Sequence, residues 1–209
     1  MADTPRLKFF YAPQSRSSIV LALLEELGAD YDLEVLSLKA KQQRGADYLA
    51  INPMGKVPAI LHGDALVTEQ VAVFLYLADL LPEAGLAPAI GDPLRGPYLR
   101  WMAFYGSCFE PAVVDRAMKR APADLSTSPY GDFETMFKTL TEQLAKGPYM
   151  LGERFTAVDV LWGGALNWTV GFKLVPDLPV INDYMARVNA RPAIRRAQAK
   201  DAECAVMQK

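Results

Sequence analysis

The sequence predicts an α/β domain over residues 1–82 followed by an all-α domain over residues 94–209. The length of 209 residues suits two small domains better than one. Short apolar runs of strand length occur in the first part of the chain, whereas apolar residues further along repeat at helical spacing. Residues 83–93 are rich in Pro and Gly, which is typical of a linker between the two domains.

The first domain is expected to begin with a strand, a helix and a second strand. Residues 7–11 (LKFFY) predict a short strand rich in aromatic residues. The helix expected over residues 15–28 has its apolar residues on one side, and Gly28 is a suitable C-terminal cap. Residues 31–38 then predict the second strand. Two strands joined by a helix in this way form a parallel pair.

A β-hairpin follows a polar segment in which residues 39–50 predict a helix with a loop. Residues 59–62 and 65–68 are short apolar runs. They flank Gly63 and Asp64, and a Gly-Asp pair between such runs indicates a tight turn.

The first domain is expected to close with a helix over residues 69–81, which Pro82 ends. Its element order is then β-α-β-α-β-β-α, which forms one compact sheet domain. After the linker every predicted element is helical. These helices are expected over residues 94–120, 133–144, 156–170, 179–189 and 192–200.

Charge and cysteine content exclude several classes of protein. The net charge is −2, with 22 basic and 24 acidic residues, so neither nucleic acid nor an anionic membrane is an expected partner. Cys108 and Cys204 lie far apart and form no CxxC pair, which argues against a disulfide framework and a metal site. We expect no signal peptide over residues 1–6 and no membrane span, and therefore a cytoplasmic location.

Two segments together resemble the cytosolic glutathione transferases. Residues 52–58 (NPMGKVP) match the family's Asn-Pro-x-Gly-Lys-Val-Pro stretch, and residues 68–70 (TEQ) match the Glu-Ser or Glu-Gln pair at its next helix. Thr156 and Asp159 also look like the family's helix-capping box, with Asp in place of the usual Glu. The resemblance spans the whole chain. It implies a thioredoxin-like first domain, glutathione as co-substrate, and a homodimer.

The resemblance implies a role for each residue of the glutathione site. A cis bond before Pro58 would turn the backbone N–H and C=O of Val57 toward the cysteinyl part of glutathione. Glu69 and Gln70, at a helix N-terminus, would hold the ammonium and carboxylate of the γ-glutamyl end. Lys56 would reach the glycine carboxylate. In the competing interpretation, residues 57–58 only begin a strand and Glu69 only complements the helix dipole.

The group that activates the thiol is expected just after the first strand. A cysteine thiol has a pKa of about 8.5, so an enzyme must favour the thiolate by a hydrogen bond or a helix N-terminus. We favour Ser15 because it fits the helix N-cap, with Ser17 second and Tyr11 third. The alternative is that these serines only cap the helix. No Cys occurs here, which argues against the thiol-transferase subgroups and for a bacterial-type member with a serine or other non-cysteine site.

The resemblance implies a detoxifying transferase that adds the glutathione thiol to a small electrophilic substrate. In the family, the first long helix of the second domain lines the pocket for that substrate. Two alternatives remain: a non-catalytic or regulatory binding protein on the same fold, and a glutathione-dependent disulfide reductase. His62, the only histidine, lies at a hairpin turn and is not expected to be catalytic.

Overall fold

A computed structural model describes residues 6–121 and 123–208 of the chain. The residues form two compact units, Met1–Ala84 with Pro192–Lys209 as the first and Gly85–Arg191 as the second. Residues 1–5, most of the segment considered for a signal peptide, lie outside the described part. Within the described part, no helix is long and apolar enough to span a membrane.

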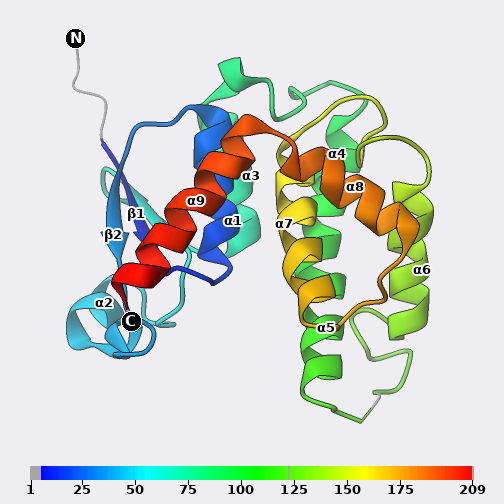
Figure 1. Cartoon of the computed structure of the whole chain (residues 1–209), viewed down its shortest axis with the longest axis horizontal. Helices are drawn as coiled ribbons and strands as arrows, with labels where there is room; N and C mark the ends of the chain where they lie inside the picture. Colours follow the sequence, from blue (N-terminus) through cyan, green and yellow to red (C-terminus); the bar gives the residue numbers. More distant parts are fainter. Residues whose placement is uncertain (1–5, 122, 209) are drawn as a thin grey trace. The chain divides into compact units, whose positions relative to one another are not determined.

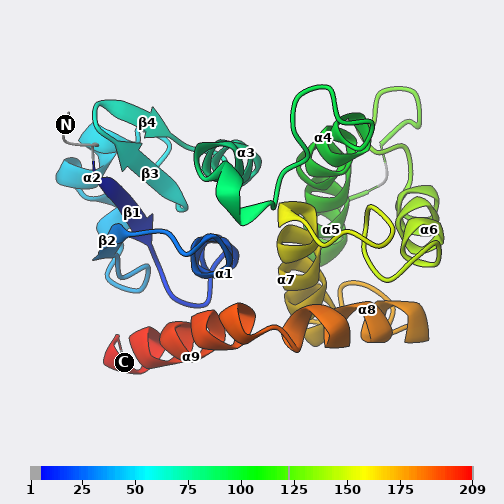
Figure 2. The same ribbon diagram turned by 90° about the horizontal axis from the view of Figure 1, so that it is seen from above.

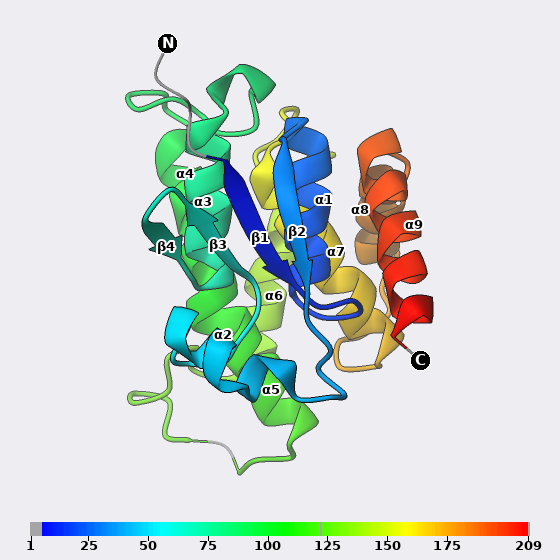
Figure 3. The same ribbon diagram turned by 90° about the vertical axis from the view of Figure 1, so that its left-hand side faces the viewer.

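The first unit is built on a four-stranded mixed sheet with the order β2-β1-β3-β4. The central strand β1 (Leu7–Tyr11) pairs in parallel with β2 (Tyr31–Val35) and antiparallel with β3 (Ala59–His62). Strand β4 (Ala65–Val67) pairs with β3 to form the predicted hairpin, and Figure 3 shows the order across the sheet. The expected element order and the thioredoxin-like fold are confirmed.

Helices cover both faces of this sheet (Figure 2). The longer helices α1 (Ser17–Leu27) and α3 (Gln70–Leu80) lie on one face, and the short α2 (Ala46–Ile51) lies on the other. The 3₁₀ turns η1 (Gln42–Arg44) and η2 (Pro82–Ala84) precede α2 and follow α3. Because side chains alternate along β1, Phe10 packs on the α2 side with Tyr48, while Phe9 and Tyr11 face the other side.

Two predicted boundaries of the first unit differ from the structure. Helix α1 begins at Ser17, and its N-cap is Arg16, so the prediction that Ser15 is the N-cap is wrong. The second strand ends at Val35 and not at residue 38. The N–H of Leu36 donates to the Tyr11 carbonyl at 2.7 Å, and the chain leaves the sheet after this bond. Gly28 caps α1 in the left-handed conformation, as expected.

The last helix, α9 (Pro192–Met207), is part of the first unit. The sequence predicts a single all-α domain over residues 94–209, whereas α9 packs alongside α1 (Figure 1). The apolar face that α9 buries explains this placement, because it includes Ile194, Ala197 and Cys204.

The second unit is helical throughout. The long helix expected over residues 94–120 is interrupted by a π-helical turn, η3 (Tyr105–Phe109). The other helices of the unit are α4 (Arg95–Phe104), α5 (Glu110–Ala117), α6 (Phe133–Leu144), α7 (Ala157–Gly171) and α8 (Pro179–Asn189).

The predicted capping box opens α7 and is buried. Asp159 has 0% of its surface exposed, and its Oδ2 accepts a hydrogen bond from the N–H of Thr156 at 2.8 Å. Its Oδ1 accepts from the N–H of Met150 at 2.7 Å and from the hydroxyl of Tyr184 at 2.9 Å. Burial nevertheless raises the pKa of Asp159 to about 6, because desolvation outweighs these hydrogen bonds.

Candidate functional site

The segments that carry the sequence motifs lie at the same end of the sheet, either just before or just after a strand. Strand β1 pairs antiparallel with β3, with Phe10 opposite Ala59, so the residues after β1 and those before β3 lie together. Strand β3 pairs antiparallel with β4, so the residues after β4 reach that end as well. The sheet therefore brings together three stretches that are far apart in sequence: residues 12–16, 52–58 and 68–70.

The loop over residues 52–58 is held by side chains from α2 and from its own first residue. Asn52 is 3% exposed, and its Nδ2 donates to the Lys56 carbonyl at 2.9 Å. The hydroxyl of Tyr48 donates to the same carbonyl at 2.6 Å. Asn52 Oδ1 in turn accepts from the N–H of Met54 at 3.1 Å. These bonds fix the backbone immediately before Val57.

Gly55 is required inside this loop. Its φ of +58° lies in the left-handed region, and a Cβ there would stand 2.7 Å from the Gln43 carbonyl oxygen and 2.8 Å from an Arg44 nitrogen. Any side chain would push the loop off the turn η1.

The peptide bond between Val57 and Pro58 is cis, as predicted. Among the described residues, neither the N–H nor the C=O of Val57 has a hydrogen-bond partner. An unpaired donor and acceptor on the backbone of one half-buried residue can pair with an extended peptide, as a sheet edge does. The neighbouring Lys56 side chain is exposed and forms no ion pair with a described residue. It remains available to an anionic group.

The start of α3 presents a helix N-terminus beside an exposed carboxylate. The first helical hydrogen bond runs from the N–H of Val73 to the carbonyl of Glu69 at 3.0 Å, so the helix itself does not use the N–H groups of residues 71 and 72. Glu69 caps the helix with φ 63° and ψ 117° and is exposed. A residue other than Gly in such a conformation is strained, and such strain concentrates at ligand sites.

Gln70 connects this helix start with the segment after β1. Its Nε2 donates to the carbonyl of Arg16 at 3.2 Å. Because Arg16 is the N-cap of α1, two of the three stretches are joined directly. The role expected for Gln70, holding a ligand carboxylate, stays a prediction.

The candidate serines differ in exposure. Ser17 is 0% exposed, and its hydroxyl donates to the Ala12 carbonyl at 2.8 Å and accepts from the Ala12 N–H at 2.9 Å. Ser15 is half-buried, and its Oγ lies 2.8 Å from the Ala12 carbonyl and 2.6 Å from Ser17 Oγ. Of these two hydroxyls, Ser15 is the one that reaches the surface, while Ser17 holds the loop from inside.

The Tyr11 side chain is buried and directed onto α9. It is 0% exposed, and its hydroxyl donates to Oδ1 of Asp201 on that helix. Burial raises the pKa of Tyr11 well above its ordinary value, and the hydrogen bond to Asp201 raises it further. A phenol held in this way is a poor donor to a thiolate elsewhere.

Sequence reasoning missed three residues that shape the site. Asn52 lies inside the motif, but the motif gives no sign that the Asn52 side chain holds the Lys56 carbonyl. Tyr48 belongs to no motif, and only its place in the helix before the 52–58 loop indicates that it could contact that loop. Asp201 follows Tyr11 by 190 residues and gives no local signal at all.

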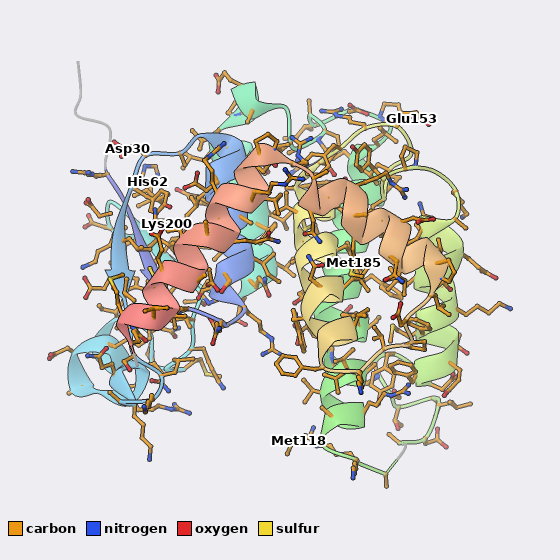
Figure 4. All side chains as sticks on the ribbon, in the orientation of Figure 1. Asp30, His62, Met118, Glu153, Met185 and Lys200 are labelled. Atoms are coloured by element: carbon orange, nitrogen blue, oxygen red, sulfur yellow. The ribbon has the colours of Figure 1, made fainter. Side chains whose placement is uncertain are left out.

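The histidine and the two cysteines lie outside the three motif segments. His62 Nδ1 lies 2.7 Å from the Tyr76 hydroxyl, at the end of β3 that pairs with Leu7, opposite the motif loops (Figure 4). Both cysteines, Cys108 and Cys204, are free. Within residues 6–121 and 123–208, no group of His, Cys, Asp and Glu side chains could hold a metal ion.

The aromatic residues of the second unit form a packed cluster around Trp162. Trp101, Tyr105 and Phe109 are buried and contact Trp162 edge to face, with ring centroids 5.0–6.1 Å apart. Phe104 is partly exposed. Core packing accounts for the three buried rings.

Comparison with known proteins gives matches to both units. The model for "Glutathione S-transferase, N-terminal domain" matches residues 5–79, and that for "Glutathione S-transferase, C-terminal domain" matches residues 130–187. Glutathione S-transferase GstA of Escherichia coli O157:H7 is 29% identical over 194 residues, covering 91% of this chain and 96% of the relative.

Solved structures agree along nearly the whole chain. A glutathione transferase from Methylococcus capsulatus is 31% identical with a TM-score of 0.78, covering 94% of this chain and 99% of its own. A sphingomonad glutathione S-transferase complexed with glutathione is 30% identical with a TM-score of 0.76, covering 93% of this chain and 98% of its own.

Proposed function

The chain belongs to the glutathione S-transferase family, and from this premise we propose how its own residues bind glutathione and activate the thiol. It is a transferase that uses glutathione as co-substrate. The observation that carries the proposal is the meeting of residues 12–16, 52–58 and 68–70 at one end of the sheet.

Glutathione would bind across these three segments as an extended peptide. The unpaired backbone N–H and C=O of Val57, next to Pro58, suit the cysteinyl amide groups. The open N-terminus of α3 suits the γ-glutamyl carboxylate, and the exposed carboxylate of Glu69 suits the ammonium. Gln70 completes this subsite. Lys56 suits the glycine carboxylate.

Ser15 would favour the thiolate of bound glutathione. Ser15 is half-buried, and its Oγ accepts from the N–H of Ser17 at 3.1 Å and donates to the Ala12 carbonyl at 2.8 Å, so a hydrogen bond to the sulfur would replace the one to Ala12. A hydrogen bond to a charged group is worth about 1.5–3 kcal/mol, and each unit of pKa requires about 1.4 kcal/mol. One such bond therefore lowers the thiol pKa by about one to two units.

The reaction then needs only a suitable carbon. The thiol proton passes to solvent, and the thiolate sulfur attacks the electrophilic carbon to form an S–C bond; where the carbon belongs to an activated double bond, its π bond breaks and the neighbouring carbon takes a proton from solvent. Where the substrate carries a leaving group, its bond to carbon breaks and the electron pair departs with it. We place the small electrophile beside the first long helix of the second unit, where Phe104 and Cys108 are partly exposed. We further propose a homodimer in the reduced cytoplasm, in keeping with the two free thiols.

Conjugation is favoured over the two alternatives by the residues at the site. A reductase that forms a mixed disulfide through its own cysteine is disfavoured, because residues 11–18 contain none, and reduction by the glutathione thiolate alone is distinguished by the disulfide assay below. A regulatory protein has no need to keep the unpaired Val57 backbone, the open α3 start and Glu69 together. Both arguments support the transferase.

Calorimetry with glutathione and a conjugation assay with a chlorodinitrobenzene test the proposal. Glu69→Ala should weaken glutathione binding by about tenfold or more, since it removes a charged partner worth about 1.5–3 kcal/mol. The matched control is Asp64→Ala, which removes an exposed carboxylate from the hairpin turn. Equal affinities in the two variants would refute the site. Turnover of a small disulfide but not of the chlorodinitrobenzene would favour the reductase.

A further inference from the structure

One carboxylate of the last helix spans the segment that carries Ser15. Asp201 Oδ1 accepts hydrogen bonds from the hydroxyls of Tyr11 and Ser18. The backbone N–H of Gln14 lies 3.2 Å from the same oxygen and 3.3 Å from Oδ2. The three donors are the last residue of β1, the middle of the following loop, and the second residue of α1. Both ends and the centre of the loop are therefore tied to a single side chain.

The helix that carries Asp201 is itself fixed to the first unit. Arg196 Nε donates to Glu25 Oε2 on α1 at 3.2 Å, and Lys200 Nζ donates to the Tyr31 hydroxyl on β2 at 2.8 Å. Figure 4 labels Lys200 on α9 beside the strands. These two contacts are on the same helix as Asp201, so the carboxylate is presented from a rigid element.

The loop needs such support because of its backbone. Gln14 has φ 53°, a left-handed conformation that is uncommon for a residue with a side chain. Its N–H is turned onto the Asp201 carboxylate. The same carboxylate accepts the hydrogen bonds that the Tyr11 and Ser18 hydroxyls donate, so neither hydroxyl is free to donate to a ligand. Ser15 lies between the two tied ends, and its hydroxyl makes no contact with Asp201.

We propose that Asp201 is a positioning residue for thiol activation, which holds residues 12–16 so that the Ser15 hydroxyl faces the glutathione sulfur. The proposal rests on the proposed function, because it takes Ser15 as the donor. Its physical reason is that a displacement of about 1 Å in a reacting geometry can cost about 100-fold in rate. Asp201 acts through the loop and does not touch the reacting atoms.

Charge alone would act in the opposite direction. A carboxylate near a thiolate disfavours the thiolate, so removing Asp201 would lower the thiol pKa if repulsion dominated. If positioning dominates, removing it raises the thiol pKa. The other charged groups beside Asp201 on α9 are Lys200, which bonds Tyr31, and Glu203, which is exposed. The sign of the shift therefore separates the two effects.

The experiment measures the pKa of bound glutathione by thiolate absorbance, together with kcat and the glutathione Kd. Asp201→Ala should raise the thiol pKa by about one unit and lower kcat by about tenfold. The Kd should stay within about threefold, because Val57, Glu69 and Lys56 still bind the peptide. Asp201→Asn keeps an acceptor oxygen and should fall between Asp201→Ala and the wild type. Glu203→Gln is the matched control and should behave as the wild type.

Ser18→Ala provides a second variant that tests the same loop. Ser18→Ala removes one donor and leaves Asp201 in place, so it should raise the thiol pKa by less than Asp201→Ala. A lowered thiol pKa in Asp201→Ala overturns the inference. If Asp201→Ala does not fold, an unchanged thiol pKa in both Asp201→Asn and Ser18→Ala overturns it instead. A wild-type chain that binds no glutathione overturns the proposed function as well. Normal glutathione binding, with variants whose bound-thiol pKa equals that of the wild type, overturns the inference alone.

Discussion

The side-chain amide of Gln70 donates a hydrogen bond to the backbone carbonyl of Arg16 at 3.2 Å. Gln70 is the first residue of α3, and Arg16 caps α1, so this bond joins the starts of two helices. The residue expected to bind one end of glutathione therefore also holds the segment expected to activate its thiol.

Gln70→Ala should change both properties together. We expect the glutathione Kd to rise, and the pKa of the bound thiol to rise as well, because Arg16 and the neighbouring Ser15 lose a support. Glu69→Ala, whose exposed side chain makes no contact with Arg16, should raise the Kd with little change in the thiol pKa. Calorimetry and thiolate absorbance on the two variants check this, and a Kd effect without a pKa effect in Gln70→Ala would contradict it.

Ser15→Ala and Ser17→Ala should fail in different ways. Ser15→Ala should raise the bound thiol pKa by about one to two units and leave the glutathione Kd nearly unchanged. Ser17→Ala should instead lower the free energy of unfolding by about 1–3 kcal/mol, because it leaves the buried N–H of Ala12 without its acceptor. Thiolate absorbance and urea unfolding separate the two. A thiol pKa that rises only in Ser17→Ala would transfer the activating role to that residue.

Stability should depend on pH through Asp159. Its pKa is raised from 3.8 to about 6, so the folded state binds the proton more tightly than the unfolded state. This group's contribution to the unfolding free energy is fully present below the unfolded pKa and is lost as the pH rises through about 6. Tyr184→Phe removes a donor to the charged form and should raise the Asp159 pKa further. Its cost should reach about 1.5–3 kcal/mol at neutral pH and shrink in acid.

Tyr130→Phe is the matched control for this pH dependence. The Tyr130 hydroxyl donates to Asp115 Oδ2 at 2.9 Å near the surface, and this bond is the largest cause of the lowered pKa of Asp115. The stability contributed by Asp115 is therefore present above its unfolded pKa and is lost as the pH falls. In urea unfolding over a pH series, the cost of Tyr184→Phe should disappear as the pH falls toward about 6, whereas the cost of Tyr130→Phe should persist until the pH falls below the ordinary aspartate pKa of 3.8. A Tyr184→Phe cost that persists to the same low pH as that of Tyr130→Phe would mean that Asp159 is not the titrating group.

Gly163→Ala should destabilise the second unit, and Gly171→Ala should not. Both glycines are in α7, where replacing Gly by Ala normally stabilises a helix by about 1 kcal/mol. At Gly163, however, a Cβ would stand 2.6 Å from Cγ1 of Val188 on α8, whereas at Gly171 nothing lies within 4 Å. We expect overpacking to cost about 1–3 kcal/mol at Gly163. Thermal unfolding of the two variants measures the difference, and adding Val188→Ala should relieve the Gly163→Ala defect.

The parts of the fold that could be predicted are those encoded locally. The Gly63-Asp64 turn specifies its hairpin through backbone geometry, and Thr156 with Asp159 specifies a helix start through reciprocal hydrogen bonds. Helix α1 starts two residues later than the sequence predicts, because several serines in this segment could cap a helix. The structure gives the N-cap to Arg16, and Ser15 and Ser17 bond to Ala12 instead.

The parts of the site that could not be predicted depend on contacts between distant residues. Val57, Pro58, Glu69 and Gln70 were found because they occur in short motifs. Asp201 was missed because its partners, Tyr11 and Ser18, precede it by 190 and 183 residues. The π-helical turn at residues 105–109 was also missed, since nothing in that run of apolar and small residues distinguishes it from an ordinary helix.

The placement of α9 has a consequence for biosynthesis. Residues 85–191 form the second unit, so in the order of translation an entire helical body separates the sheet from the helix that completes its unit. The ribosome must therefore release the sheet, α1 and α3 long before Asp201 emerges. During that interval the nascent first unit exposes the face of α1 that α9 later covers, and the loop with Ser15 lacks its carboxylate. The proposed activating loop therefore reaches its final form only after the second unit has been synthesised.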